Sequence, residues 1–129
     1  MSTRSDVESL PHTVENLLRL VFRHREELAE LKARLDQRDA QHYNDRSIQR
    51  DTSAARLKLV VSRAGEKPIH APHNLPALNT LQDLVDLDMP TVKRYLAFYG
   101  VDEAHPYLAQ YGHDACLEMY LRGDPALLG

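Results

Sequence analysis

The residues of this chain that could carry out chemistry are few, and the first to consider is its lone cysteine, Cys116. His113 precedes it by three residues, a spacing that on a helix would bring a thiol close to an imidazole base. The same cysteine also shares an apolar helical face with Leu117, Tyr120 and Leu121. We expect this second arrangement, in which the cysteine is buried and packs as a small hydrophobic residue.

A metal or cofactor site is not expected. His70 and His73 are ligands of the right type, but they are only a pair and they lie in a Pro-rich segment, whereas zinc sites use three or four protein ligands. The sequence has seven histidines, yet they form no set at ligand spacing, and it has neither a Cys pair nor a Gly-rich phosphate loop. We therefore expect no metal, no cofactor and no enzymatic activity.

Residues 80–96 have the pattern of a helix-turn-helix. Its second helix would carry Thr91, Lys93 and Arg94 toward a DNA major groove, where arginine reads guanine well. The link between the two helices is short, however, and it lacks the usual turn glycine. Acidic side chains also crowd the neighbouring surface: Asp83, Asp86 and Asp88. DNA binding is therefore kept as the alternative hypothesis.

The distribution of charge also disfavours nucleic acid. The formal net charge is −3 at pH 7, and the acidic residues concentrate in the C-terminal part. Residues 76–129 contain eight Asp or Glu against three Lys or Arg, so most of this part would repel a phosphate backbone. The basic residues between 46 and 63 are scattered, as is typical of a solvated surface.

The elements that must position these residues begin with a long helix near the N-terminus. Between residues 7 and 42, apolar residues recur every seven positions, with Val or Leu at one heptad position (a) and Leu three residues later (d). A helix cannot bury such a seam alone, so the pattern predicts a coiled coil, and Val at a with Leu at d favours two parallel strands. The residues that we expect at the interface are Val14, Leu17, Val21, Leu28, Leu31 and Leu35.

Two features leave the oligomeric state open. Leu18, Leu20 and Phe22 flank the seam and widen the apolar face, which would also suit a trimer, a tetramer or a second element packed there. His24 is a polar residue at a d position, and we interpret it as setting the register rather than as a ligand or a pH sensor. The alternative for the whole pattern is an amphipathic helix that lies on its own domain.

The segment after the long helix, residues 51–76, should contain a short helix or strand and then a Pro-rich linker. Its apolar residues fit a helical face and a strand face equally well. We favour a helix over residues 53–64, because Ser53 can cap its start and Gly65 can close its end.

The last segment, residues 77–129, should form a small acidic domain of short helices. Asn79 should cap the first of them, with Gln82 at the capping-box position. Proline just inside the start and glycine just past the end should then bracket the next two helices, by Pro90 and Gly100 and by Pro106 and Gly112.

The sequence thus predicts an all-α fold: an N-terminal parallel coiled-coil helix (1–50) followed by a small bundle of short helices. The expected function is a non-enzymatic homo-oligomeric interaction module, which acts as a scaffold, adaptor or assembly component and presents the acidic domain to a protein partner. The alternative is a dimeric helix-turn-helix-like DNA-binding transcriptional regulator. The residues expected at the partner, which would equally suit a core, are Tyr95, Tyr99, Tyr107 and Tyr111.

The expected location is the cytoplasm. The apolar stretches are far shorter than the ~20 residues that cross a bilayer, so no membrane partner is expected. No hydrophobic region follows the charged N-terminus, as it would in a signal peptide. A lone cysteine, which cannot form an internal disulfide, fits a reducing compartment.

Overall fold

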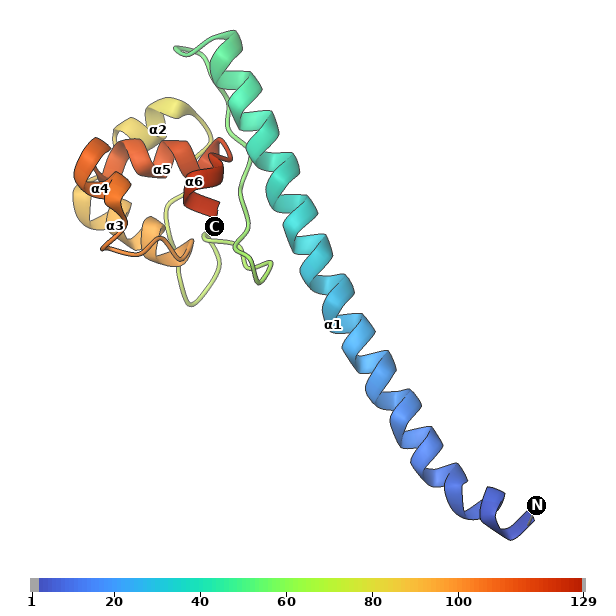
Figure 1. Cartoon of the computed structure of the whole chain (residues 1–129). Helices are drawn as coiled ribbons and strands as arrows, with labels where there is room; N and C mark the ends of the chain where they lie inside the picture. The colour runs from blue at the N-terminus through green and yellow to red at the C-terminus, as the bar shows by residue number, and fades with distance from the viewer. Residues whose placement is uncertain (1–2, 129) are drawn as a thin grey trace.

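A helix of 48 residues, α1 (Thr3–Arg50), dominates the computed structural model, and its N-terminal half projects far beyond the rest of the chain (Figure 1). The structure describes the backbone of residues 3–128 and the side chains of residues 12–127. Glycine is absent from α1, and the helix ends where the hydroxyl of Thr52 donates to the carbonyl oxygen of Ile48 at 3.1 Å. The long N-terminal helix is therefore confirmed.

Five short helices follow within the described residues, and together with the segment that leads to them they form what we call the body (residues 51–128). They are α2 (Leu81–Val85), α3 (Met89–Phe98), α4 (Pro106–Tyr111), α5 (His113–Leu121) and α6 (Pro125–Leu128). The described residues contain no β-strand, so the all-α fold class is confirmed.

Helix α5 is the centre of the body, since α1, α2, α3, α4 and α6 all contact it. The side chains of Cys116 and Leu117 on α5 are completely buried, and Tyr120 and Leu121 are nearly so. Val92, Tyr95 and Leu96 of α3 belong to the same hydrophobic core. The apolar helical face predicted around Cys116 is thus the core-facing side of α5.

Proline and glycine bracket α3 and α4 as predicted. Pro90 lies in the first turn of α3, behind an Asp88 cap that accepts the backbone N–H of Thr91 at 3.0 Å, and Gly100 follows the helix. Pro106 is the first residue of α4, and Gly112 comes directly after its last.

The predicted cap of α2 is wrong by one residue. Thr80, not Asn79, is the N-cap: its hydroxyl accepts the N–H of Asp83 at 3.2 Å. The Asp83 carboxylate accepts the N–H groups of both Thr80 and Asn79, at 3.1 and 3.0 Å. A short carboxylate at the third helical position therefore completes the capping box instead of Gln82.

The helix favoured for residues 53–64 does not form, and this expectation is wrong. The segment runs extended between α1 and the short helices of the body, with one isolated bridge between Arg56 and Thr80. Its backbone groups bond to other parts of the chain: Leu57 N–H donates to the carbonyl oxygen of Asn79 at 2.8 Å, and Lys58 N–H to the side-chain oxygen of Asn44 at 2.7 Å. These tertiary partners replace the hydrogen bonds that a helix would have made.

Candidate oligomerisation surface

The C-terminal half of α1 packs on the body through one narrow face, which we call the docking face. Half of its side chains are buried amides, and the other half are two alanines and an isoleucine. Its members are Ala33, Gln37, Ala40, Gln41, Asn44 and Ile48, all of them buried. Buried amides need hydrogen-bond partners, and each of the three finds them on the body.

Asn44, which is fully buried, makes the largest set of these hydrogen bonds. Its Nδ2 donates to the carbonyl oxygens of Lys58 (3.2 Å) and Leu121 (3.0 Å), while its Oδ1 accepts from the N–H of Lys58. One side chain thereby joins α1, the extended segment and the end of α5.

The two glutamines repeat this arrangement nearer the N-terminus. Gln37 Nε2 donates to the carbonyl oxygen of Val61 (3.1 Å) and to the hydroxyl of Tyr120 (2.6 Å), and Gln41 Nε2 donates to the carbonyl oxygen of Tyr120 (2.8 Å). A Cβ on Gly123 would lie 3.2 Å from the Cβ of Gln41, so glycine permits the close approach of the two chains. The body therefore holds the C-terminal half of α1 in one orientation.

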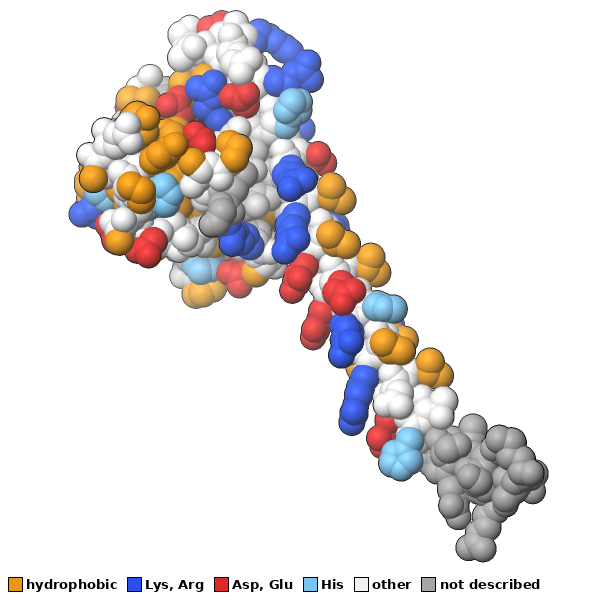
Figure 2. Space-filling view, viewed as in Figure 1, with side chains coloured by type: hydrophobic (Ala, Val, Ile, Leu, Met, Phe, Trp, Pro, Cys, Tyr) orange, Lys and Arg blue, Asp and Glu red, His pale blue; other side chains and the backbone are white. Residues whose placement is uncertain are grey.

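The predicted seam lies on the opposite side of α1. Leu35 of the seam and Asn44 of the docking face are nine residues apart, which places their side chains roughly 180° apart at ~100° per residue. Every seam residue is exposed, and the exposed fractions run from 46% for Val21 to 64% for Leu28. Hydrophobic side chains accordingly line one edge of the projecting helix in Figure 2. Val7 and Leu10, which belong to the same heptads, lie outside the residues whose side chains are described.

The positions of the seam and the docking face test the alternative in which α1 is an amphipathic helix that lies on its own domain. The helix does pack on the body, but through its docking face and only from Ala33 onward. All side chains from His12 to Lys32 are exposed, including the flanking Leu18, Leu20 and Phe22 and the polar His24. The apolar side of the helix is therefore not covered by its own chain.

The tyrosines predicted to contact a partner divide into two pairs. Tyr95 and Tyr99 belong to the core, so their assignment as contact residues is wrong. Burial raises the pKa of Tyr95 to about 12 and that of Tyr99 well above its usual value, so both remain protonated donors, to the carbonyl oxygens of Pro76 and Val60. Tyr107 is half-buried and Tyr111 is half-exposed, so both remain candidates for contact.

The residues proposed for DNA contact lie on the exposed side of α3. Arg94 is already engaged, because its Nη2 donates to the carbonyl oxygen of His73 at 2.7 Å. Lys93 is exposed, and Thr91 sits in the Asp88 cap at the start of the helix. An aspartate therefore lies beside the surface that would meet phosphate.

The candidate catalytic and metal-binding residues make other contacts. Cys116 is buried, which raises the pKa of its thiol, while His113 faces Glu103 at 3.5 Å. His73 contacts Glu66 at 2.7 Å and packs edge-on against Phe98. Among the described residues, no group of three or more His, Cys, Asp or Glu could hold a metal ion.

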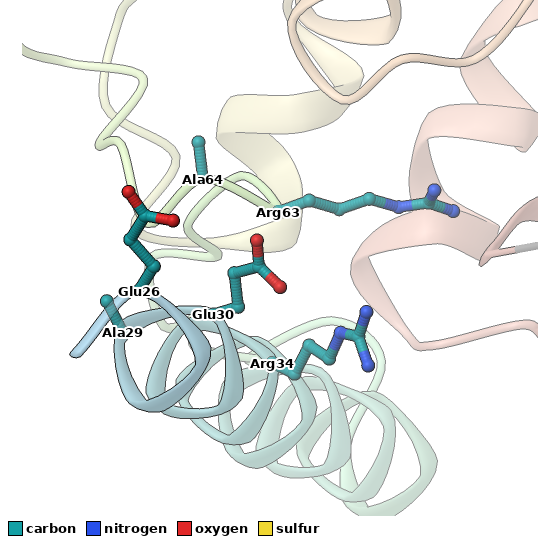
Figure 3. Close-up of a pocket in the computed structure, with 6 residues that line it drawn as sticks. All are labelled: Glu26, Ala29, Glu30, Arg34, Arg63 and Ala64. Atoms are coloured by element: carbon teal, nitrogen blue, oxygen red, sulfur yellow. The ribbon is translucent and has the colours of Figure 1, made fainter. Parts of the chain in front are cut away.

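A hollow of about 530 Å³ lies where the projecting part of α1 leaves the body (Figure 3). The side chains of Glu26 and Glu30 extend from α1 toward the turn that carries Arg63 and Ala64, and Arg34 lies further along the helix. Two carboxylates and two guanidinium groups balance one another in charge, so the hollow favours neither a cation nor an anion.

The structure is therefore that of an all-α protein in which a long helix projects from a small helical body. The apolar seam of this helix is exposed, and the body packs on its opposite side. The chain belongs to the family described as Mug135-like, C-terminal domain, whose model matches residues 42–122, more than half of the chain. The match covers the last turns of α1 and the body as far as Arg122, and it leaves the projecting part of α1 outside. No curated protein and no solved structure matches the chain. None of the described helices has the length and apolar character needed to cross a membrane.

Proposed function

We propose that this chain is a non-enzymatic, homo-oligomeric interaction module, a scaffold, adaptor or assembly component that joins copies through the seam of α1. The observation that carries the proposal is the exposure of all six described seam residues on one side of a projecting helix. Extended apolar patches are rare on the surface of monomeric proteins and mark interaction sites. Burying a Leu or Val side chain contributes about 1.5–3 kcal/mol, so the seam can supply ample free energy for association.

The pattern of the seam supports a second copy in a parallel dimer as the partner. In the first half of the described seam, Val14 and Val21 occupy a positions and Leu17 lies between them at d, the combination that favours two parallel helices. In that arrangement Glu27 of one helix faces Lys32 of the other, and Arg34 faces Asp39, so both pairs attract. All four side chains are exposed and lie beside the seam, where they are available for these contacts.

The docking face supports the idea that such a dimer presents its bodies outward. Because the body is held on the side of α1 opposite the seam, pairing through the seam leaves both bodies on the outside and at the same end. Two bodies with a fixed spacing would bind a repetitive or paired protein partner with increased avidity and without new contacts. On the body, we propose that the half-exposed Tyr111 and the half-buried Tyr107 contact this protein partner.

Absence of enzymatic activity is part of the same proposal. It is supported by the burial of Cys116, whose raised pKa keeps the thiol protonated and unreactive. A cytoplasmic location is also proposed, because a lone cysteine suits a reducing compartment. DNA binding through Thr91, Lys93 and Arg94 remains the alternative, and the hydrogen bond of Arg94 to the His73 carbonyl disfavours it.

The test is a pair of substitutions in the seam of the full chain. Leu28→Asp with Leu31→Asp should convert a dimer to a monomer in sedimentation equilibrium, because four carboxylates would enter the apolar contact. The matched control, Asn16→Asp with Ala29→Asp, adds the same charge at exposed positions outside the seam and should leave the mass unchanged. An unchanged mass in the seam variant would contradict the proposal.

Adding random-sequence duplex DNA at low salt to the same samples tests the alternative. We expect no protein–DNA complex. A complex that is weakened by Lys93→Ala with Arg94→Ala, and whose affinity falls with salt, would put the DNA-binding hypothesis first.

A further inference from the structure

Four basic side chains gather around Tyr43 at the C-terminal end of α1. With that tyrosine they form what we call the basic patch: Tyr43, Arg46, Arg50, Arg56 and Lys58, all of them exposed. Arg46 and Arg50 belong to α1, whereas Arg56 and Lys58 belong to the extended segment that follows it. Lys and Arg side chains accordingly cluster at this end of α1 in Figure 2. The fold thus brings together cations that look scattered along the sequence.

Hydrogen bonds hold the extended segment beside this part of α1. The N–H of Arg56 donates to the hydroxyl of Ser47 at 3.1 Å, and the N–H of Lys58 donates to Oδ1 of Asn44 at 2.7 Å. The ammonium group of Lys58 lies 4.3 Å from the centre of the Tyr43 ring, a cation–π contact. The tyrosine therefore joins the cations of the helix to those of the segment.

Burial alternates along the segment, which turns its two cations toward solvent. Ala55 and Leu57 are buried in the core, while Arg56 and Lys58 are exposed. This period of two is that of extended backbone with one solvent face. Arg56 and Lys58 therefore project from the same face of the segment, and its backbone fixes their spacing.

None of the four cations of the basic patch forms an ion pair within the described residues. The neighbouring carboxylates have other partners: Asp45 binds Nε of Arg122 at 2.8 Å, and Asp51 accepts hydrogen bonds from the loop that follows it. Like charges four residues apart on a helix, such as Arg46 and Arg50, repel one another. The patch is therefore a local, uncompensated positive surface on a chain whose formal net charge is −3.

The spacing of these cations matches that of an extended peptide. Arg46 and Arg50 are four residues apart on a helix, which is a rise of ~6 Å. Arg56 and Lys58 are two residues apart on an extended segment, which is a rise of ~6.6 Å. In an extended peptide, alternate side chains lie on one face and repeat every ~6.6 Å. Carboxylates at alternate positions of such a peptide would therefore meet either pair of cations in register.

We propose that the basic patch binds an acidic, extended segment of a protein partner, with Asp or Glu at alternate positions. Guanidinium groups suit this role, because their planar fork binds a carboxylate through two parallel hydrogen bonds. The exposed part of Tyr43 offers an apolar contact between the two pairs of cations, as tyrosine commonly does at interfaces. The last seam residue, Leu35, comes more than two helical turns before Tyr43, so the inference does not depend on the dimer proposed above.

An acidic peptide suits the basic patch better than a nucleic acid. The patch is small and the body beside it is acidic, with eight Asp or Glu against three Lys or Arg in residues 76–129. A phosphate backbone that extended past the patch would be repelled by this surface. A short acidic segment, in contrast, can pair with the four cations and end there.

The test is fluorescence anisotropy of a labelled peptide in which glutamate and serine alternate, titrated with the full chain at low salt. Arg46→Gln with Arg50→Gln should weaken binding at least tenfold, because it removes two of the four charges and keeps long polar side chains in the helix. Arg56→Gln with Lys58→Gln should weaken binding to a similar extent. The affinity of the unaltered chain should fall as salt is added, since all of the paired charges are exposed.

The matched control is Arg19→Gln with Arg23→Gln. It removes two exposed arginines at the same four-residue spacing, from the projecting part of α1 and outside the basic patch. Its affinity for the peptide should stay within twofold of that of the unaltered chain. A second control is a peptide in which glutamine replaces every glutamate, which should not bind.

Three results would overturn the inference. The first is a failure of the unaltered chain to bind the alternating glutamate peptide. The second is an equal loss in the patch variants and the arginine control, or equal binding of the glutamine peptide, because the named cations would then have no specific role. The third is tighter binding of a single-stranded oligonucleotide that the same patch variants abolish, which would assign the patch to nucleic acid instead.

Discussion

The side-chain amide of Gln37 donates to the hydroxyl of Tyr120 at 2.6 Å, across 83 positions of sequence. Both groups are buried, and each serves as the hydrogen-bond partner of the other where α1 meets the central helix α5 of the body. The contact makes the C-terminal half of α1 a structural part of the body. The orientation of the seam relative to the body is therefore fixed by the fold.

The docking face should contribute measurably to stability, and Asn44 is its most sensitive position. Asn44→Ala removes partners from the carbonyl oxygen of Leu121, at a buried contact, and from the N–H of Lys58, at a partly buried one. Leaving such groups unsatisfied costs ~1–3 kcal/mol each, so we expect a loss of about 2–4 kcal/mol in the free energy of unfolding. Urea denaturation measures it, and Gln49→Ala, at an exposed position of the same helix, should cost less than about 0.5 kcal/mol. Equal losses for both variants would refute the role of the docking face.

Gly123 should be more sensitive to alanine than another glycine of the same conformation. Its φ is +83° and a Cβ would press on Gln41 at 3.2 Å, whereas Gly100, at φ +76°, would meet nothing within 4 Å. Gly100→Ala should therefore cost about 1 kcal/mol for the left-handed backbone alone. Gly123→Ala should cost about 1 kcal/mol more, because overpacking adds to it. Thermal unfolding of the two variants side by side compares them, and a smaller loss at Gly123 would contradict the close approach.

The Cys116 thiol should be protected from reagents in the folded protein. Burial raises its pKa, so the reactive thiolate becomes populated only at a higher pH than in the unfolded chain. A disulfide-exchange reagent at pH 8 should react at least tenfold faster in 6 M urea than in buffer. Fast reaction in the native state at near-neutral pH would instead support a nucleophilic cysteine.

The parallel orientation of the two α1 helices in the proposed dimer can be tested with a single added cysteine. In a parallel dimer in register, the two residues at position 35 face each other, so Leu35→Cys should form a disulfide-linked dimer under mild oxidation. Asp36→Cys, one residue further and outside the seam, should cross-link far less. Denaturing gels without reductant would show the difference. Equal cross-linking at both positions would contradict parallel pairing through the seam.

The sequence predicted well those features that depend on local rules. The uninterrupted α1 follows from the absence of glycine and from helical periodicity, and Pro90 and Pro106 mark the starts of α3 and α4 because proline suits the first turn of a helix. The burial of Cys116 followed from its apolar neighbours on one helical face.

The features that sequence reasoning missed depend on tertiary partners. Gln37, Gln41 and Asn44 resemble ordinary solvent-facing residues of a charged helix, and only the carbonyl groups of the body explain their burial. The one signal was the pair of alanines, Ala33 and Ala40, which make that side of the helix small enough for a close approach. The prediction of a helix over residues 53–64 was wrong for the same reason, since the hydrogen-bond partners of this segment lie outside it.

The most direct test of the central claim is the mass of the unaltered full chain in sedimentation equilibrium at low salt. We predict a mass of at least two chains at micromolar concentration, which Leu28→Asp with Leu31→Asp reduces to one. A monomer at every concentration would contradict the account, because the exposed seam would then have no second copy to cover it.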